Sequence, residues 1–363
     1  MPTLNPLASR SLLRALVLSL LLGAGALALV VWWLGPDELR AVRAIRPAWL
    51  ALAIGFFLAS FLFAGARLAM LVRRSGERIH LRHAVRAHVL GLFASTVTPG
   101  GSGGMPAVAL VLQRQGIPHG AAWSVAVAAT TADTVFYGWS LPVALVVLRT
   151  TTGALDDAPG LQGLIVGVAA VALVVAYLLA FRLAWLAPIA GVVLRGRLAR
   201  FRPQADRFIH ELVAANERLQ RASWRWHGLF HLLVAGSWST FFLVLWASAR
   251  GFGVEAQPLP VVAAMSIVAG VGSLFPTPGG SGFFEFGASL ALLSQSGRSG
   301  VAAAVVVWRA VSHYSLYLIG PMLGGYLVVR TAAAPADAET AASGSAGERG
   351  GERGGRRSDD GES

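Results

Sequence analysis

Thr98-Pro99-Gly100-Gly101-Ser102-Gly103 and Thr277-Pro278-Gly279-Gly280-Ser281-Gly282 are two copies of one phrase, and each copy interrupts an apolar segment of the chain. Glycine and proline favour turns and leave backbone amides without helical partners. Hydrocarbon tolerates such backbone only where it is buried in protein or lines a wet cavity. A loop of this kind, present twice in corresponding places, predicts a repeated membrane fold that handles a substrate.

The composition of the chain predicts an integral membrane protein. Apolar residues make up 55% and charged residues only 13%, and the mean hydropathy is +0.62, far from the values of soluble domains. A membrane-crossing helix needs about 20 apolar residues, and about six runs reach or approach this length. We therefore expect an all-α protein with about six full transmembrane helices. The runs are 16–35, 49–72, 121–148, 161–181, 229–249 and 301–329.

Two further apolar regions, 89–112 and 260–293, are cut by the repeated phrase into pieces that are mostly shorter than a span. Pieces of this length favour re-entrant hairpins or broken helices. The alternative is that either region crosses the membrane once, in two halves.

The distribution of charge predicts an orientation, because short loops rich in arginine stay on the cytoplasmic side. Arginines in 10–14, 73–86 and 182–225 then fall inside, whereas Asp156 and Asp157 fall outside. The first hairpin would enter from the cytoplasm and the second from the outside, as in an inverted repeat. We expect a bacterial cytoplasmic membrane protein with both termini in the cytoplasm.

The same pattern predicts one polytopic transmembrane domain over residues 1–330. Its half-repeats are roughly 47–149 and 227–330. The basic cytoplasmic segment 182–225 is either an amphipathic helix on anionic headgroups or an ordinary basic loop. Residues 331–363 contain little that can be buried and are expected to form a disordered cytoplasmic tail.

Several classes of chemistry are excluded or unsupported. The chain has neither cysteine nor lysine, so thiolate and Schiff-base mechanisms are excluded. His80, His83 and His88 do not share one helix face, and no metal or other cofactor is expected. The net charge of +12 follows from topology, so nucleic acid is not an expected partner.

Ionisable residues at membrane depth are the candidate substrate-binding residues, together with every residue of both phrases. Glu285 follows Gly282 at the start of a helix, where it either faces a ligand or serves only as a charge partner for the helix end. Arg309 and His313 are four residues apart on one face and could meet a phosphate, or Glu285 or Asp133 in a structural ion pair.

Four tryptophans within the apolar runs are interpreted as packing and interface residues. They are Trp123, Trp139, Trp238 and Trp246.

The paired phrases, Glu285 and the late helix from Trp308-Arg309 to Pro321 and Gly324 resemble the transmembrane region of the lysylphosphatidylglycerol synthase family. Arg67 also resembles a basic position of that family. The resemblance implies movement of a phospholipid or a lipid-linked precursor between leaflets. Fused members carry a soluble aminoacyl-transferase domain, and we expect no synthase activity from 331–363.

The sequence departs from the family pattern in its first half. Met105 stands where many relatives carry an acidic residue, and the acidic-basic pair expected in the next helix is reduced to Asp133. We therefore expect the first half to have lost part of its polar site.

Three functions remain open at this point. The leading one is a flippase-like protein that binds an anionic lipid headgroup or a lipid-linked precursor. The second is a membrane-embedded lipid transferase. The third is a non-transporting partner of a cytoplasmic enzyme, anchored through 182–225. None of these features specifies an oligomeric state.

Overall fold

The computed structural model describes residues 42–153, 156–181, 221–273 and 277–324, with isolated positions within 21–32 and 202–217. Every regular element in this part of the chain is a helix. The elements of the first half are η1 (Val42–Ala44), α3 (Pro47–Arg74), α4 (Leu81–Val97), η2 (Pro99–Gly101), α5 (Gly104–Arg114), α6 (His119–Thr152) and α7 (Pro159–Phe181).

The second half contains the same kinds of element. Its last long helix runs from Val301 to Gly324 and includes one turn of π-helix. The elements are α10 (Trp224–Gly251), α11 (Pro258–Gly272), η5 (Pro278–Gly280), α12 (Phe283–Leu293), α13 (Val301–Arg309) and the π turn η6 (Ala310–Tyr314).

Five helices among the described residues are long and apolar enough to cross a membrane, with 20 to 34 residues and mean hydropathies of 1.3 to 2.3. They coincide with five of the expected spans and support a helical membrane protein. The first expected span, 16–35, lies mostly outside the described residues, so a sixth crossing stays a prediction. The five are Pro47–Arg74, His119–Thr152, Pro159–Leu178, Trp224–Gly251 and Val301–Gly324.

Helix ends follow from local chemistry. Pro47 stands in the first turn of α3, where a missing N–H costs no hydrogen bond, and Arg74 ends the helix beside its negative pole. Gly153 ends α6 in the left-handed conformation at φ +63°. Ser223 caps α10 by accepting a hydrogen bond from the backbone N–H of Trp226 at 3.3 Å.

Each repeated phrase joins two short helices that pack against each other. α4 and α5 have 17 and 11 residues, and α11 and α12 have 15 and 11. Gly91 of α4 lies against Val108 of α5, and Gly287 of α12 lies against Val268 of α11. The chain therefore turns back at each phrase and forms a helical hairpin rather than a straight crossing.

The order of elements recurs in the two halves: a long helix, a short helix, a 3₁₀ turn, a short helix and a long helix. The turns also share a backbone conformation. Gly100 has φ 59° and ψ 19°, and Gly279 has φ 60° and ψ 16°, values that favour glycine. The opposite membrane orientation of the halves stays a prediction.

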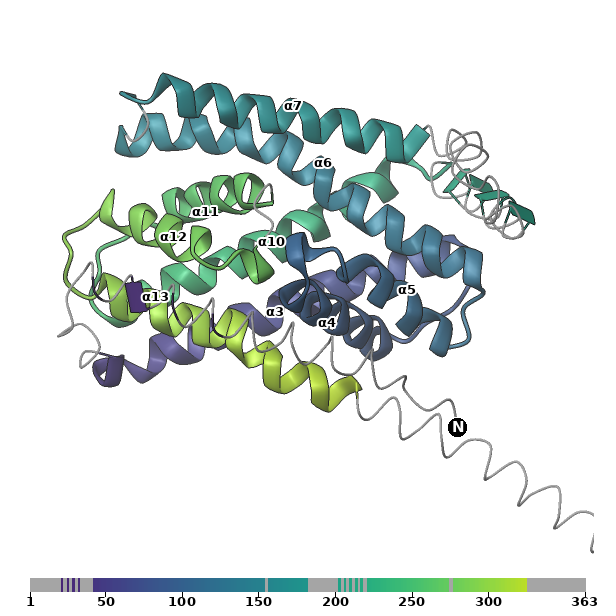
Figure 1. Ribbon diagram of the computed structural model, residues 1–363, viewed down its shortest axis with the longest axis horizontal. Coiled ribbons are helices and arrows are strands. Elements are labelled where there is room, and N and C mark those ends of the chain that lie inside the picture. The colour runs from purple at the N-terminus through teal and green to yellow at the C-terminus, as the bar shows by residue number, and fades with distance from the viewer. Residues whose placement is uncertain are drawn as a thin grey trace, which may run out of the picture.

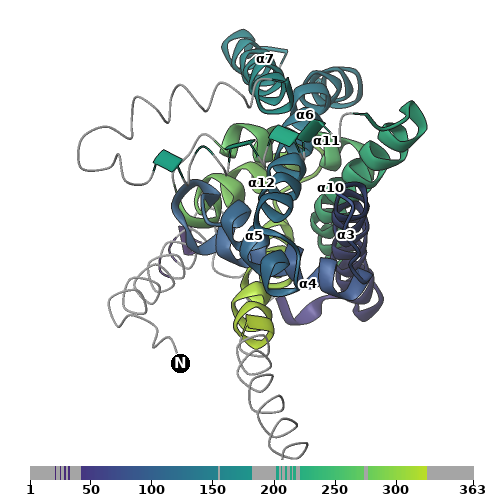
Figure 2. The same cartoon turned by 90° about the vertical axis from the view of Figure 1, so that its right-hand side faces the viewer.

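The two halves meet along their first long helices and at the tips of their hairpins. α3 packs along α10, and η2 contacts η5. The Ser237 hydroxyl of α10 donates a hydrogen bond to the Ser60 carbonyl of α3 at 3.2 Å, and Trp49 meets Trp246 edge-on at 5.4 Å between ring centroids. Figures 1 and 2 show α7 on the outside of this body, alongside α6.

Two of the segments predicted from the sequence lie largely or wholly outside the described residues. The predicted amphipathic helix over 182–225 lies largely outside the described residues, and the predicted tail, 331–363, lies wholly outside them.

We expect Gly65→Ala to destabilise the protein by about 1–3 kcal/mol, the range for overpacking a close contact. An added Cβ at Gly65 of α3 would lie 2.3 Å from Cγ2 and 3.1 Å from the backbone of Val85 in α4. The measurement is the thermal unfolding midpoint in detergent.

Gly55→Ala in the same helix is the matched control, because a Cβ there meets nothing within 4 Å. It should be neutral or stabilising, by about 0.5–1 kcal/mol, from helix propensity. A Gly65→Ala protein that melts no lower than Gly55→Ala would contradict the close packing of α3 on α4.

Candidate functional site

A cavity of about 420 Å³ lies inside the bundle and is lined by both halves of the chain. This volume is within the usual range of ligand sites in proteins. Both hairpin tips contribute to its wall, through Gly100 and Gly101 of the first and Thr277, Gly279 and Gly280 of the second.

The cavity brings together half of the residues that the sequence predicts as substrate-binding. Asp133, Arg309 and His313 line it, with the five loop residues just named. Thr98, Ser102, Gly103, Ser281 and Gly282 belong to the same loops, and Pro99 and Pro278 begin the two 3₁₀ turns. Glu285 is 1% exposed and lies beside Arg309.

The wall of the cavity combines apolar side chains with a few charged ones. Leu68, Leu92 and Phe241 contribute apolar surface, whereas Arg67 and Arg309 contribute positive charge. A wall of this composition suits an amphipathic ligand, because burial of apolar groups and contact with a charged group are both available.

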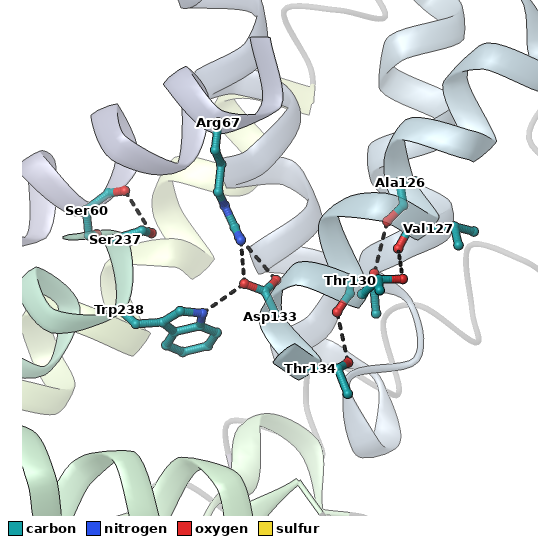
Figure 3. A network of polar contacts seen from close by, with 10 residues as sticks. Ser60, Arg67, Ala126, Val127, Thr130, Asp133, Thr134, Ser237 and Trp238 are labelled. Atoms are coloured by element: carbon teal, nitrogen blue, oxygen red, sulfur yellow. Dashed lines mark hydrogen bonds and ion pairs between the residues drawn. The ribbon is translucent and has the colours of Figure 1, made fainter. Parts of the chain in front are cut away.

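Arg67 of α3 and Asp133 of α6 form the ion pair of the first half (Figure 3). Arg67 Nη1 lies 2.5 Å from Asp133 Oδ1, and Nη2 lies 3.1 Å from Oδ2, so the pairing is bidentate. Trp238 of α10 donates its indole N–H to Oδ1 at 2.8 Å. The cluster therefore ties three long helices together at the cavity.

This cluster bears on two expectations. The acid of α6 has a basic partner, which comes from α3 rather than from its own helix, so the first half keeps one charged pair, and the loss of another part of its polar site stays a prediction. Trp238 packs on Phe136 as expected, with rings stacked at 6.1 Å, but it also hydrogen-bonds Asp133. The family resemblance points to Arg67 in the sequence, and an arginine within an apolar run is itself a signal for a buried partner.

Glu285 and Arg309 form the ion pair of the second half. Arg309 Nη2 lies 2.9 Å from Glu285 Oε2, and the side chains are 4% and 1% exposed. The same oxygen accepts a hydrogen bond from the Gly282 N–H at 2.8 Å. Glu285 thus stabilises the start of α12 and neutralises Arg309, as two of the expectations have it, whereas its contact with a ligand stays a prediction.

His313 lies against the second hairpin tip. A Cβ at Gly279 would come 2.2 Å from His313 Cε1, so only glycine permits this approach. The π turn over Ala310–Tyr314 lies between Arg309 and the C-terminal part of the helix, and both Arg309 and His313 line the cavity as their spacing predicts. π turns within α-helices are frequent at functional sites.

Three residues that line the cavity carry buried polar atoms with no protein hydrogen-bond partner in the described part of the chain. The atoms are Thr277 Oγ1, Trp308 Nε1, and Nε and Nη2 of Arg309. The contact of Nη2 with Glu285 is an ion pair that lacks hydrogen-bond geometry. An unpaired buried donor costs about 1–3 kcal/mol, which makes such atoms notable at a cavity.

The histidine cluster of the sequence is separated in the structure. His88 lines the cavity, near Phe61, whereas the ring of His80 meets that of His83. Among the described residues no group of three or more histidine, aspartate or glutamate side chains is placed to hold a metal ion.

We expect Asp133→Ala to lower the stability of the protein by about 3 kcal/mol, because it leaves the Arg67 guanidinium buried without a carboxylate. Adding Arg67→Met should recover part of this loss, and both effects can be followed by thermal unfolding in detergent. Asp156→Ala is the control, since the Arg149–Asp156 pair is about half exposed and such pairs contribute about 0–1 kcal/mol. Equal losses from the two single substitutions would contradict a structural role for the buried pair.

Comparison with known proteins agrees with this architecture. A family model described as the lysylphosphatidylglycerol synthase TM region matches residues 16–320. A UPF0104 membrane protein of Archaeoglobus fulgidus is 28% identical over 109 residues, which are 30% of this chain and 33% of that protein. The chain thus matches about a third of the length of this relative. The match over residues 16–320 shows that the chain belongs to the family of the lysylphosphatidylglycerol synthase transmembrane region.

Proposed function

We propose that this protein moves a lipid with an anionic headgroup, a phospholipid or a lipid-linked precursor, between the leaflets of a bacterial cytoplasmic membrane. The observation that carries the proposal is the largely apolar cavity between two helical hairpins, with two buried arginines in its wall. Acyl chains match the apolar wall, and a phosphate matches a guanidinium.

The arginines differ in what they can offer to a headgroup. Arg67 is held by both oxygens of Asp133, so its charge is largely engaged within the protein. Arg309 contacts one oxygen of Glu285 and has donors without protein partners. We therefore assign headgroup binding mainly to Arg309, with Glu285 limiting how strongly it binds.

The two hairpins supply the membrane path in this proposal. Ligand sites of inverted-repeat transporters lie near the midplane, where broken helices of the two halves meet. The contact of η2 with η5 beside the cavity fits such a site. With the hairpins entering from opposite faces, both chain termini are in the cytoplasm, and movement of one half against the other would open the cavity to each side in turn.

We expect Arg309→Ala to lower the stability of the protein, because Glu285 loses its counter-charge, and to abolish lipid movement by the protein that remains folded. The assay uses vesicles of phosphatidylcholine and phosphatidylglycerol that contain the purified protein and fluorescent phosphatidylglycerol. Dithionite bleaches only outward-facing label, so wild-type vesicles should lose the inner-leaflet signal as well, and Arg309→Ala vesicles should retain it.

Arg149→Ala is the matched control, because Arg149 also pairs with an aspartate but lies at the exposed end of α6. It should move lipid as the wild type does. Movement at the wild-type rate in Arg309→Ala would remove Arg309 from the proposed site. Mass spectrometry of the recovered lipid completes the test, since a chemically altered lipid would indicate a transferase instead.

A further inference from the structure

The two copies of the repeated phrase share a backbone turn but use their threonines differently. In the first copy the Thr98 hydroxyl accepts a hydrogen bond from the Gly103 N–H at 2.8 Å. The same hydroxyl donates one to the Ala94 carbonyl at 2.8 Å. The Thr98 hydroxyl therefore serves as both donor and acceptor within its own hairpin.

In the second copy a carboxylate, rather than the threonine hydroxyl, accepts the hydrogen bond from the last glycine of the phrase. The Gly282 N–H, the counterpart of Gly103, donates to Glu285 Oε2 at 2.8 Å. Gly282 has φ +92° where Gly103 has −76°, so the backbone differs between the two copies at this position. Pro106 occupies the place of Glu285 in the first copy and offers no carboxylate.

The second threonine is left for another partner. Thr277 lines the cavity, and its buried hydroxyl has no hydrogen-bond partner among the residues that the structure describes. Two other residues of the cavity wall also have buried donors without a hydrogen-bond partner among the described residues. Arg309 is 3% exposed and its Nε has no partner, and Trp308 is 1% exposed and its Nε1 has no partner.

These groups select one ligand chemistry. Arg309 Nε and Trp308 Nε1 can only donate hydrogen bonds, and a threonine hydroxyl can donate one as well. A set of donors that includes a cation favours an oxyanion with several acceptor oxygens, as in a phosphodiester. The acceptor-only carboxylate nearby is already engaged by Gly282 and Arg309.

We infer that the two phrases have divided their roles: the loop at 98–103 is a self-capped structural turn, and Thr277 of the second loop binds the phosphodiester of the ligand together with Arg309 and Trp308. Glu285 acts here as a positioning residue, because it bonds the amide that Thr277 would otherwise cap. This inference rests on the proposed function and deepens it by naming the hydroxyl and the ligand group.

The test compares Thr277→Val with Thr98→Val in the purified full-length protein in a neutral detergent. The measurement is the thermal unfolding midpoint as dioleoyl phosphatidylglycerol is added, since a ligand of the native state raises it in proportion to occupancy. Dioleoylglycerol, which has the same acyl chains and no phosphate, and inorganic phosphate are added in parallel.

We expect Thr277→Val to keep the lipid-free midpoint of the wild type and to need roughly tenfold or more phosphatidylglycerol for half of the stabilisation. Thr277→Ser, which restores the hydroxyl, should behave as the wild type does. Thr98→Val should lower the lipid-free midpoint by several degrees and keep the wild-type half-saturating concentration. If Thr98→Val yields no folded protein, recovery of folding in Thr98→Ser supports the structural role.

Four results would overturn the inference in whole or in part. One is an unchanged half-saturating concentration in Thr277→Val, and another is an equal loss of lipid-free stability in both valine variants. Equal stabilisation by phosphatidylglycerol and dioleoylglycerol would show that the protein does not recognise the phosphodiester. Stabilisation by inorganic phosphate alone, lost in Thr277→Val, would overturn a lipid as the source of the oxyanion.

The proposed function is judged separately by leaflet movement. If the wild-type protein binds phosphatidylglycerol through Thr277 but does not move it between leaflets, the inference about Thr277 holds and the proposed transport function is wrong.

Discussion

Non-helical backbone inside a membrane must find its hydrogen bonds within the protein, and this constraint shapes the whole structure. Each TPGGSG turn contains an internal backbone hydrogen bond. The Gly101 N–H donates to the Thr98 carbonyl and the Gly280 N–H donates to the Thr277 carbonyl, both at 3.1 Å. The turns also need cover from other helices, because no lipid tail can bond their remaining polar groups. The long helices of both halves supply that cover, and both turns line the same cavity.

Buried charge imposes the second constraint. An isolated guanidinium in a low-dielectric interior is strongly unfavourable, so Arg67 and Arg309 each need a carboxylate. The pairs differ in what they connect. Arg67–Asp133 joins α3 to α6, and through Trp238 to α10, whereas Arg309–Glu285 joins α13 to the start of α12. The first pair secures the frame of long helices, and the second secures a hairpin to its neighbour.

The sequence predicted the parts of the structure that are encoded locally. Apolar runs located five long helices, and the glycines and proline of the repeated phrase located the hairpin turns. The positions of Asp133, Glu285, Arg309 and His313 were recognised because charge within an apolar run is rare. Periodicity along one helix cannot tell which neighbour faces it, so the pairing of Asp133 with Arg67, 66 residues away, became visible only in the fold.

The π turn in the last long helix could not be predicted from the sequence, because it is a local change in the hydrogen-bond register of the helix. The π turn over Ala310–Tyr314 has no glycine or proline to announce it. The different hydrogen bonding of Thr98 and Thr277 could not be predicted either, because the two phrases are identical in sequence. Their difference arises at Pro106 and Glu285, which follow the phrases, and in the backbone of Gly282, the last residue of the second phrase. Identical motifs therefore need their surroundings before a role can be assigned.

The charge balance of the cavity bears on how a transported lipid could leave it. The two arginines of the cavity wall and the carboxylates that pair with them, Asp133 in the wall and Glu285 behind it, sum to zero, so a phosphate that approaches Arg309 must share it with Glu285. Sharing weakens the attraction, because the guanidinium is already partly neutralised, and this suits a carrier that must release its cargo. An unpaired arginine would hold the same phosphate more tightly and would itself be costly to bury while the cavity holds no ligand. In the proposed transport Glu285 would have two effects on one site: it would free Thr277 to face the headgroup, and it would keep Arg309 from binding that headgroup too strongly to release it.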